Sequence, residues 1–103
     1  MTNKRTVMPT VQLTGYIDVP ENLLNEVLQA LPDHVHNTRA EPGCLAFNVT
    51  QQTDRPTRFD VTEQFIDRQA FESHQQRVRL SDWGRLTVDV ERYYEVTEHP
   101  SED

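Results

Sequence analysis

The order of hydrophobic periods along the chain limits the folds that it can form. Four segments alternate apolar and polar residues with a period of two, which predicts half-buried β-strands: residues 11–19, 45–51, 58–66 and 88–96. Two other segments repeat apolar residues at every third or fourth position, which predicts amphipathic helices over residues 23–35 and 67–79. The predicted order is strand, helix, strand, strand, helix, strand.

Turn-forming residues separate these segments. Glu41-Pro42-Gly43 is expected to end the first helix, and the polar residues 53–57 to join two strands as a hairpin. Asp67 is suited to cap the second helix, and Ser81 to begin a short additional helical turn. Pro32 lacks the N–H that a helix interior needs, so it predicts a kink or a restart of the first helix.

This order is typical of the ferredoxin-like α+β fold, β-α-β-β-α-β, in which an antiparallel four-stranded sheet carries its helices on one face. Residues 11–96 are predicted to form one domain, and the polar residues 1–10 and 97–103 to be flexible tails. The other face of the sheet must meet water or a second copy of the chain. It is expected to carry short polar and aromatic side chains, which favour a hydrated dimer interface: Thr14, Tyr16, Asn48, Thr50, Thr62, Gln64 and Tyr93.

The composition limits the classes of binding partner and the kinds of site that are expected for this chain. The 103 residues carry a formal net charge of −7 and scattered basic residues, which argues against a nucleic-acid or anionic-membrane partner. One cysteine, Cys44, allows no internal disulfide, and no spacing of histidines, cysteines or acids suggests a metal site. The absence of a long apolar run predicts a cytoplasmic protein without a membrane span.

Glu63 occupies a position where the strand pattern calls for an apolar residue. It falls on the same face as Phe59, Val61 and Phe65. Burying a carboxylate costs several kcal/mol, roughly, unless the group is paired or protonated. Three explanations remain open: a bulge that turns Glu63 outward, a buried ion pair, or a place in the wall of a pocket. The candidate partners for an ion pair are Arg39, Arg58 and Arg92.

His74 is the second candidate, because it shares the apolar face of its predicted helix with Ala70 and Phe71. A histidine there is either a satisfied core residue or a group that titrates near neutrality in a cavity. The strand of Glu63 leads directly into the helix of His74, so the two side chains are expected to line one cavity. His34 lies at the edge of the first helix's leucine stripe and is a weaker pocket candidate, whereas His36 is expected to face solvent.

The residues from Arg39 to Leu45, then Phe47, Arg58-Phe59, Glu63, Phe65, Ala70-Phe71 and His74, resemble the antibiotic biosynthesis monooxygenase family over about residues 11–96. The resemblance implies a dimeric α+β barrel, in which two ferredoxin-like sheets pair as a homodimer. It also implies oxygenation of electron-rich aromatics, such as quinols and anthrones, by O2 without a metal or another cofactor.

The resemblance assigns roles residue by residue. It implies that His74 is a base or a donor that holds an anion, and that Glu63 orients His74 or is itself the base. Phe47, Phe65 and Trp83 would form the walls of the substrate site, with His34 and Phe71 beside them. Phe65 stands where relatives often have tryptophan, so any role for an indole N–H there is absent.

Other activities remain open at the level of sequence. The segment 79–88 has no histidine that could serve as an axial ligand, which argues against the haem degradation known in the family. Arg77, Arg79 and Arg85 keep open an isomerase-type enzyme acting on a small phosphorylated compound. A dimeric ligand-binding or stress-response module without turnover is the remaining alternative.

Overall fold

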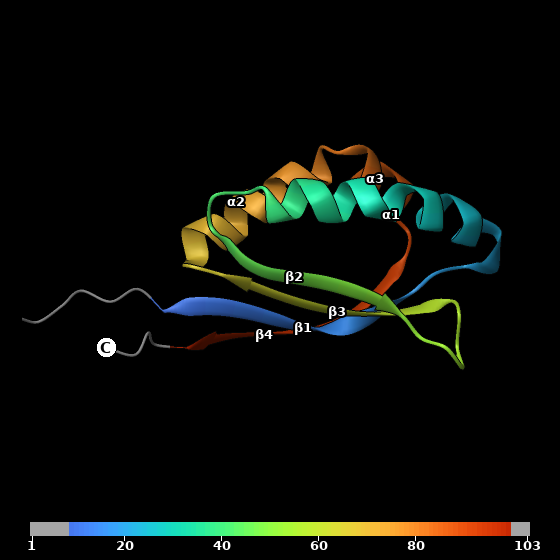
Figure 1. The fold of residues 1–103 in the computed structure, drawn as a ribbon, viewed down its shortest axis with the longest axis horizontal. Coiled ribbons are helices and arrows are strands. Elements are labelled where there is room, and N and C mark those ends of the chain that lie inside the picture. Colours follow the sequence, from blue (N-terminus) through green and yellow to red (C-terminus); the bar gives the residue numbers. More distant parts are fainter. Residues whose placement is uncertain (1–8, 100–103) are drawn as a thin grey trace, which may run out of the picture.

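A computed structural model describes residues 9–99 as one four-stranded sheet with a layer of helices on one face (Figure 1). The strands are β1 (Thr10–Asp18), β2 (Cys44–Gln51), β3 (Arg58–Phe65) and β4 (Glu91–His99). They lie in the order β2-β3-β1-β4, and each neighbouring pair is antiparallel. The helices are the 3-10 turn η1 (Glu21–Leu23), α1 (Leu24–Arg39), α2 (Arg68–Arg79) and α3 (Asp82–Leu86). The predicted ferredoxin-like α+β fold is confirmed.

The predicted caps and turns position the helical layer. The Asp67 side chain accepts a hydrogen bond of 2.8 Å from the Ala70 N–H, and Ser81 accepts one of 3.1 Å from Gly84. Pro32 was predicted to kink or restart the first helix, but α1 continues through it as one helix. Pro32 is exposed, and buried residues of α1 on both sides of it, Val27 and His34, hold the helix on the sheet.

The last strand differs from its prediction. Residues 88–90 lie in the turn after α3, and β4 begins at Glu91 rather than at Val88. At its other end β4 includes residues 97–99, which the sequence placed in a tail, because Thr10 pairs with His99 along the full length of β1. Every residue of this edge strand is exposed, so backbone pairing rather than an apolar pattern determines its extent. Thr10, which was also predicted to lie in a tail, is the first residue of β1. Residues 1–8 and 100–103 of the two predicted tails lie outside the described residues.

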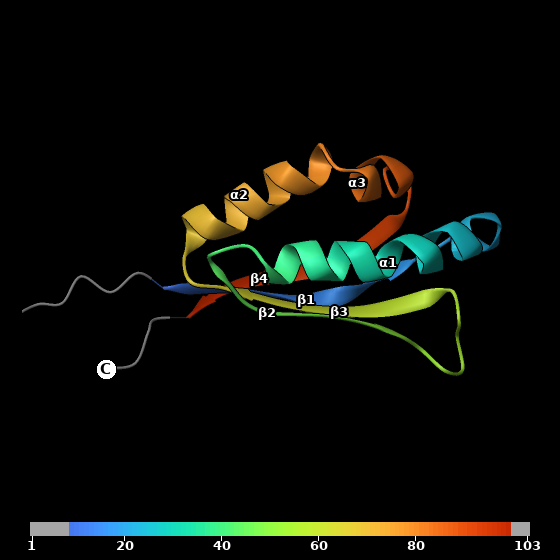
Figure 2. The same cartoon turned by 45° about the horizontal axis from the view of Figure 1, so that its top comes forward.

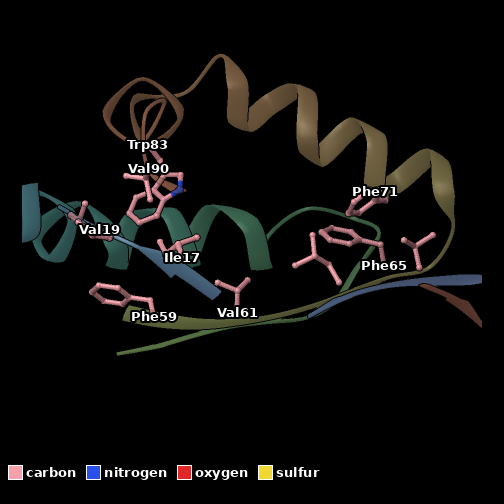
Figure 3. Close-up of a cluster of buried hydrophobic side chains, with 11 residues drawn as sticks. Ile17, Val19, Phe59, Val61, Phe65, Phe71, Trp83 and Val90 are labelled. Atoms are coloured by element: carbon pink, nitrogen blue, oxygen red, sulfur yellow. The ribbon is translucent and has the colours of Figure 1, made fainter. Parts of the chain in front are cut away.

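Figure 2 shows the sheet and the helical layer from a second direction. The core lies between these two layers. β1 and β3 contribute Ile17, Phe59, Val61 and Phe65, and the helical layer adds Phe71 and Trp83 (Figure 3). The opposite face of the sheet carries the predicted polar and aromatic residues. There Tyr16 stacks on Tyr93 at 4.9 Å between ring centroids, and the Arg58 guanidinium carbon lies 3.8 Å from the centroid of the Tyr16 ring.

Candidate functional site

Glu63 lies on the helix-facing side of the sheet. Its Cα is opposite Leu13 of β1 and Phe47 of β2, and the residue is only 7 % exposed. The sheet does contain a bulge, but at Cys44–Ala46 of β2, where Leu45 is turned outward and is 53 % exposed. The register of β3 therefore excludes the outward orientation of Glu63.

No arginine pairs with Glu63 in the part of the chain that the structure describes. Arg58 forms a two-point ion pair with Asp18, at 2.8 and 2.9 Å, on the opposite face of the sheet. Arg39 donates to the Phe47 carbonyl at 3.0 Å, and Arg92 donates to the carbonyls of Thr87 and Val90 at 2.9 Å. A buried ion pair with one of these arginines is thus not the reason for the position of Glu63.

His74 connects Glu63 to a second carboxylate. The imidazole is 2 % exposed, and its Nε2 lies 3.7 Å from Glu63 Oε1. Its Nδ1 lies 3.1 and 3.2 Å from the two carboxylate oxygens of Glu41. Arg77 completes the arrangement, since its Nε donates to Glu41 Oε2 at 2.5 Å and its Nη2 donates to Thr38 Oγ1 at 3.0 Å.

Glu41 was predicted only as part of the turn that ends the first helix, and not as a site residue. Gly43 brings that turn against α2: a Cβ added at Gly43 would lie 2.3 Å from the Ala70 Cβ. The Ile66 N–H also donates to the Gly43 carbonyl at 2.9 Å. The glycine in the turn and the alanine in the helix are the sequence signal that Glu41 and His74 approach each other.

A small inner cavity borders Glu63. Its volume of about 30 Å³ corresponds to roughly one water molecule. It is lined by Ile17, His34, Phe47, Val49, Val61, Glu63, Trp83, Arg92 and Tyr94. Two buried polar atoms of this lining, His34 Nδ1 and Glu63 Oε1, have no hydrogen-bond partner among the described residues. Each of these atoms therefore has unused hydrogen-bonding capacity.

A larger outer hollow lies between α1, α2 and α3. Its volume of about 480 Å³ is within the range of small-molecule sites, roughly 300–1,000 Å³. His34 and Trp83 line both this hollow and the inner cavity. Their rings stack with centroids 4.4 Å apart and planes inclined by 3°, so the stacked pair forms a shared wall of both spaces.

The predicted site residues separate into two groups. Glu63, His34, Phe47 and Trp83 line the inner cavity. His74 does not line it, so the prediction that Glu63 and His74 share one cavity is wrong; the buried imidazole lies behind Glu63 instead. Phe65 and Phe71 line neither space; Phe65 packs on the His74 ring at 4.9 Å and on Phe71 at 5.9 Å between centroids. Phe65 therefore supports the imidazole from the core, and Phe71 packs on Phe65.

Burial determines the protonation of the site. It raises the pKa of Glu63 to about 7, with a second contribution from the charge of Glu41. It lowers the pKa of His34 to about 3, and it lowers the pKa of His74 against the opposing effect of the Glu41 hydrogen bond. Near pH 7 both imidazoles are therefore neutral, and Glu63 exists in both its protonated and ionised forms.

Tyr94 is a further polar group near Glu63, and the sequence pattern did not predict it as a site residue. Although the residue as a whole is 37 % exposed, it lines the inner cavity from β4, and burial of its phenol, followed by the charge of Glu63, raises the pKa of that group to about 12. The phenol is therefore an O–H donor at every physiological pH.

Two of the three arginines considered for a phosphate cluster, Arg77 and Arg85, line the outer hollow, and both are paired with carboxylates. Arg77 pairs with Glu41, and Arg85 pairs with Asp82. Across residues 9–99 no group of three or more histidine, cysteine, aspartate or glutamate side chains is placed to hold a metal ion. Within the same range, no helix is long and apolar enough to cross a membrane.

Fold and site together define a small α+β protein that buries a carboxyl–imidazole pair between a sheet and its helices. The sequence model of the family called antibiotic biosynthesis monooxygenase matches residues 10–85, so the chain belongs to this family. A search of curated proteins finds no significant match.

Solved structures share the fold. A candidate oxidoreductase from Bacteroides thetaiotaomicron is 18 % identical, with a TM-score of 0.74 over 87 % of this chain and 97 % of that one. A candidate antibiotic biosynthesis monooxygenase from Nitrosomonas europaea is 19 % identical, with a TM-score of 0.71 over 96 % and 95 %. A second candidate antibiotic biosynthesis monooxygenase, from Bacteroides thetaiotaomicron, is 23 % identical, with a TM-score of 0.71 over 88 % and 87 %. At these identities the likeness concerns the fold alone.

Proposed function

We propose that the protein is a cofactor-independent monooxygenase that oxidises a quinol- or anthrone-like aromatic with O2. The observation that carries this proposal is the unpartnered Glu63 oxygen at the inner cavity, on a carboxyl whose pKa is raised to about 7. A carboxyl with that pKa can accept a proton from a bound substrate near neutral pH. His74, 3.7 Å behind it, can receive the proton in turn.

The sizes of the two spaces determine how the substrate would bind. An aromatic ring system is too large for the inner cavity of about 30 Å³ but fits the outer hollow of about 480 Å³. The ring would lie in the outer hollow, and its hydroxyl would reach Glu63 when the stacked rings of His34 and Trp83 shift. The hydroxyl would then meet the two unpartnered atoms, Glu63 Oε1 and His34 Nδ1.

Loss of the proton prepares the substrate for O2. The anion of a quinol or anthrone is electron-rich enough to transfer an electron to O2 directly. Arg92 and Tyr94 border the same cavity and supply a positive charge and an O–H donor that stabilise the anion. In the overall reaction one oxygen atom enters the product and the other leaves as water: the CH₂ group of an anthrone and O2 yield a carbonyl group and water, and a quinol and O2 yield a hydroxyquinone and water.

A panel of quinols and anthrones tests this function. Each compound is mixed with the purified protein, and O2 uptake is recorded together with ¹⁸O incorporation from labelled O2. We expect at least one member to consume one O2 per product and to retain one labelled atom. Binding of panel members without O2 uptake would instead identify a ligand-binding module, and binding that weakens steeply with salt would indicate a charged, phosphorylated ligand.

We also propose that the open face of the sheet pairs with a second copy of the chain. Tyr16, Tyr93 and Arg58 form a stacked aromatic and cationic group on this face, and Tyr93 is 47 % exposed. Aromatic residues and arginine are enriched in protein interfaces.

Placing an acid in this group is expected to separate the dimer. In Tyr93→Asp a carboxylate would be desolvated against the partner's sheet, while the helix-facing site is untouched. Sedimentation velocity should show a dimer for the native chain and a monomer for the variant. Glu26→Gln, on the outer surface of α1, is the control that should remain dimeric. A native chain that sediments as a monomer would contradict the pairing.

A further inference from the structure

Each nitrogen of the His74 imidazole faces a carboxyl group: Nε2 faces Glu63, and Nδ1 faces Glu41. The proposed function uses only Glu63. We propose that Glu41 is a positioning residue, which holds His74 in the Nδ1–H tautomer and stabilises the imidazolium that forms when His74 takes a proton from Glu63. This inference rests on the proposed function for its catalytic consequence, but its structural part can be measured without any substrate.

The contacts specify the tautomer. Glu41 Oε1 and Oε2 lie 3.2 and 3.1 Å from Nδ1, within hydrogen-bonding distance, and a carboxylate can only accept. Nδ1 must therefore carry the hydrogen. The lone pair of the neutral ring is then on Nε2, which faces Glu63 Oε1 at 3.7 Å. That distance is longer than a hydrogen bond, so a small approach of Glu63 accompanies proton transfer.

Glu41 is itself held in place. Arg77 binds its Oε2 at 2.5 Å and is anchored by Thr38, whose hydroxyl accepts from Arg77 Nη2 at 3.0 Å. The close approach of Gly43 to Ala70 keeps the turn that carries Glu41 against α2. A carboxylate fixed by a guanidinium on one side orients the imidazole on its other side, as outer partners do for catalytic histidines.

The charges around His74 support this role. Glu41 approaches from the turn after α1, Glu63 from β3, His34 from α1, and Arg77 from the next turn of α2. When the Glu63 carboxylic acid passes its proton to Nε2, it becomes a carboxylate and His74 becomes an imidazolium between two carboxylates. The positive charge of Arg77 disfavours the imidazolium of His74, but this charge is paired with the Glu41 carboxylate. The stored proton can later be returned to the reduced oxygen atom that leaves as water.

The test uses Glu41→Gln and ¹⁵N-labelled histidine. Long-range ¹H–¹⁵N NMR spectra distinguish a protonated from an unprotonated ring nitrogen, so they report the His74 tautomer directly. We expect Nδ1–H in the native protein. In the variant, the glutamine amide can donate to Nδ1, and the Nε2–H tautomer should become populated. Glu41→Asp keeps the acceptor and should retain Nδ1–H, and Glu72→Gln, on the exposed surface of α2, should leave the spectrum unchanged.

Kinetics add a second measurement. If the aromatic substrate is oxidised, Glu41→Gln should lower kcat by about 10- to 100-fold with little change in KM, because Glu41 touches His74 and not the substrate. An Nε2–H tautomer in the native protein, or an unchanged Nδ1–H tautomer in Glu41→Gln, would overturn the role of Glu41. If Glu41→Gln does not fold, the His74 tautomer of the native protein tests the role of Glu41 by itself: Nδ1–H supports that role, and Nε2–H contradicts it. Absence of O2 uptake with the expected tautomers would instead refute the proposed function and leave the positioning intact.

Discussion

Replacing Glu63 with glutamine is expected to lower O2 consumption with the aromatic substrate by about 100-fold or more, because general-base catalysis contributes roughly 10²- to 10⁴-fold. Glutamine has nearly the same shape and keeps a carbonyl oxygen at the inner cavity, but it cannot accept a proton. The loss should therefore appear in kcat, and it should persist at every pH between 6 and 9. Initial rates of O2 uptake with a saturating substrate measure it.

A control on the same strand separates the chemistry from a general effect on the sheet. Asp60 lies three residues before Glu63 on the opposite, exposed face, so Asp60→Asn should keep native turnover. His74→Ala should lose activity by a similar factor, because Glu63 would have no group to which it can pass its proton. Native rates in both Glu63→Gln and His74→Ala would eliminate the proposed mechanism.

The sequence was sufficient to predict the fold and the inward positions of two candidate residues, Glu63 and His74, because these depend on local periodicity. The alternation over 58–66 placed Glu63 on the core face, and the helical spacing from Ala70 placed His74 toward it. The two residues meet because β3 leads directly into α2. The period-two pattern was less informative for β4. All residues of this edge strand are exposed, so its extent depends on backbone pairing and not on an alternation of apolar residues.

The rest of the site depends on contacts between distant segments, which no local pattern encodes. Glu41 reaches His74 across 33 residues of sequence, because the turn at Gly43 packs against Ala70. The position of Phe65 on the core face was predicted, but its distance along the strand from the inner cavity was not. Likewise, the pairing of Arg77 with Glu41 joins residues 36 positions apart and is a tertiary property, whereas Arg85 pairs with Asp82 within α3.

Glu63→Gln is also expected to stabilise the protein at alkaline pH. The pKa of Glu63 rises from 4.5 to about 7 on folding, so above pH 7 the folded state holds a buried charge that the unfolded state solvates better. At 1.36 kcal/mol per pKa unit, this costs about 3 kcal/mol of unfolding free energy. The cost is absent below pH 4.5, grows as pH rises to about 7, and is constant above it. Glutamine removes the charge and therefore the cost.

The difference in unfolding free energy between Glu63→Gln and the native protein reports the effect of Glu63 separately from that of the histidines. The lowered pKa values of His34 and His74 make native stability fall as pH drops below 6.5, which opposes the Glu63 trend in the same range. Both histidines are present in the variant, so subtracting native from variant stability largely cancels their contribution. Urea unfolding at equal protein concentration should give a difference near zero at pH 4.5 that rises to about 3 kcal/mol at pH 8. A difference that does not change with pH would mean that Glu63 titrates in the folded chain as it does in the unfolded one. The carboxyl would then be a fixed anion at neutral pH, too weak a base for the proton transfer proposed for it.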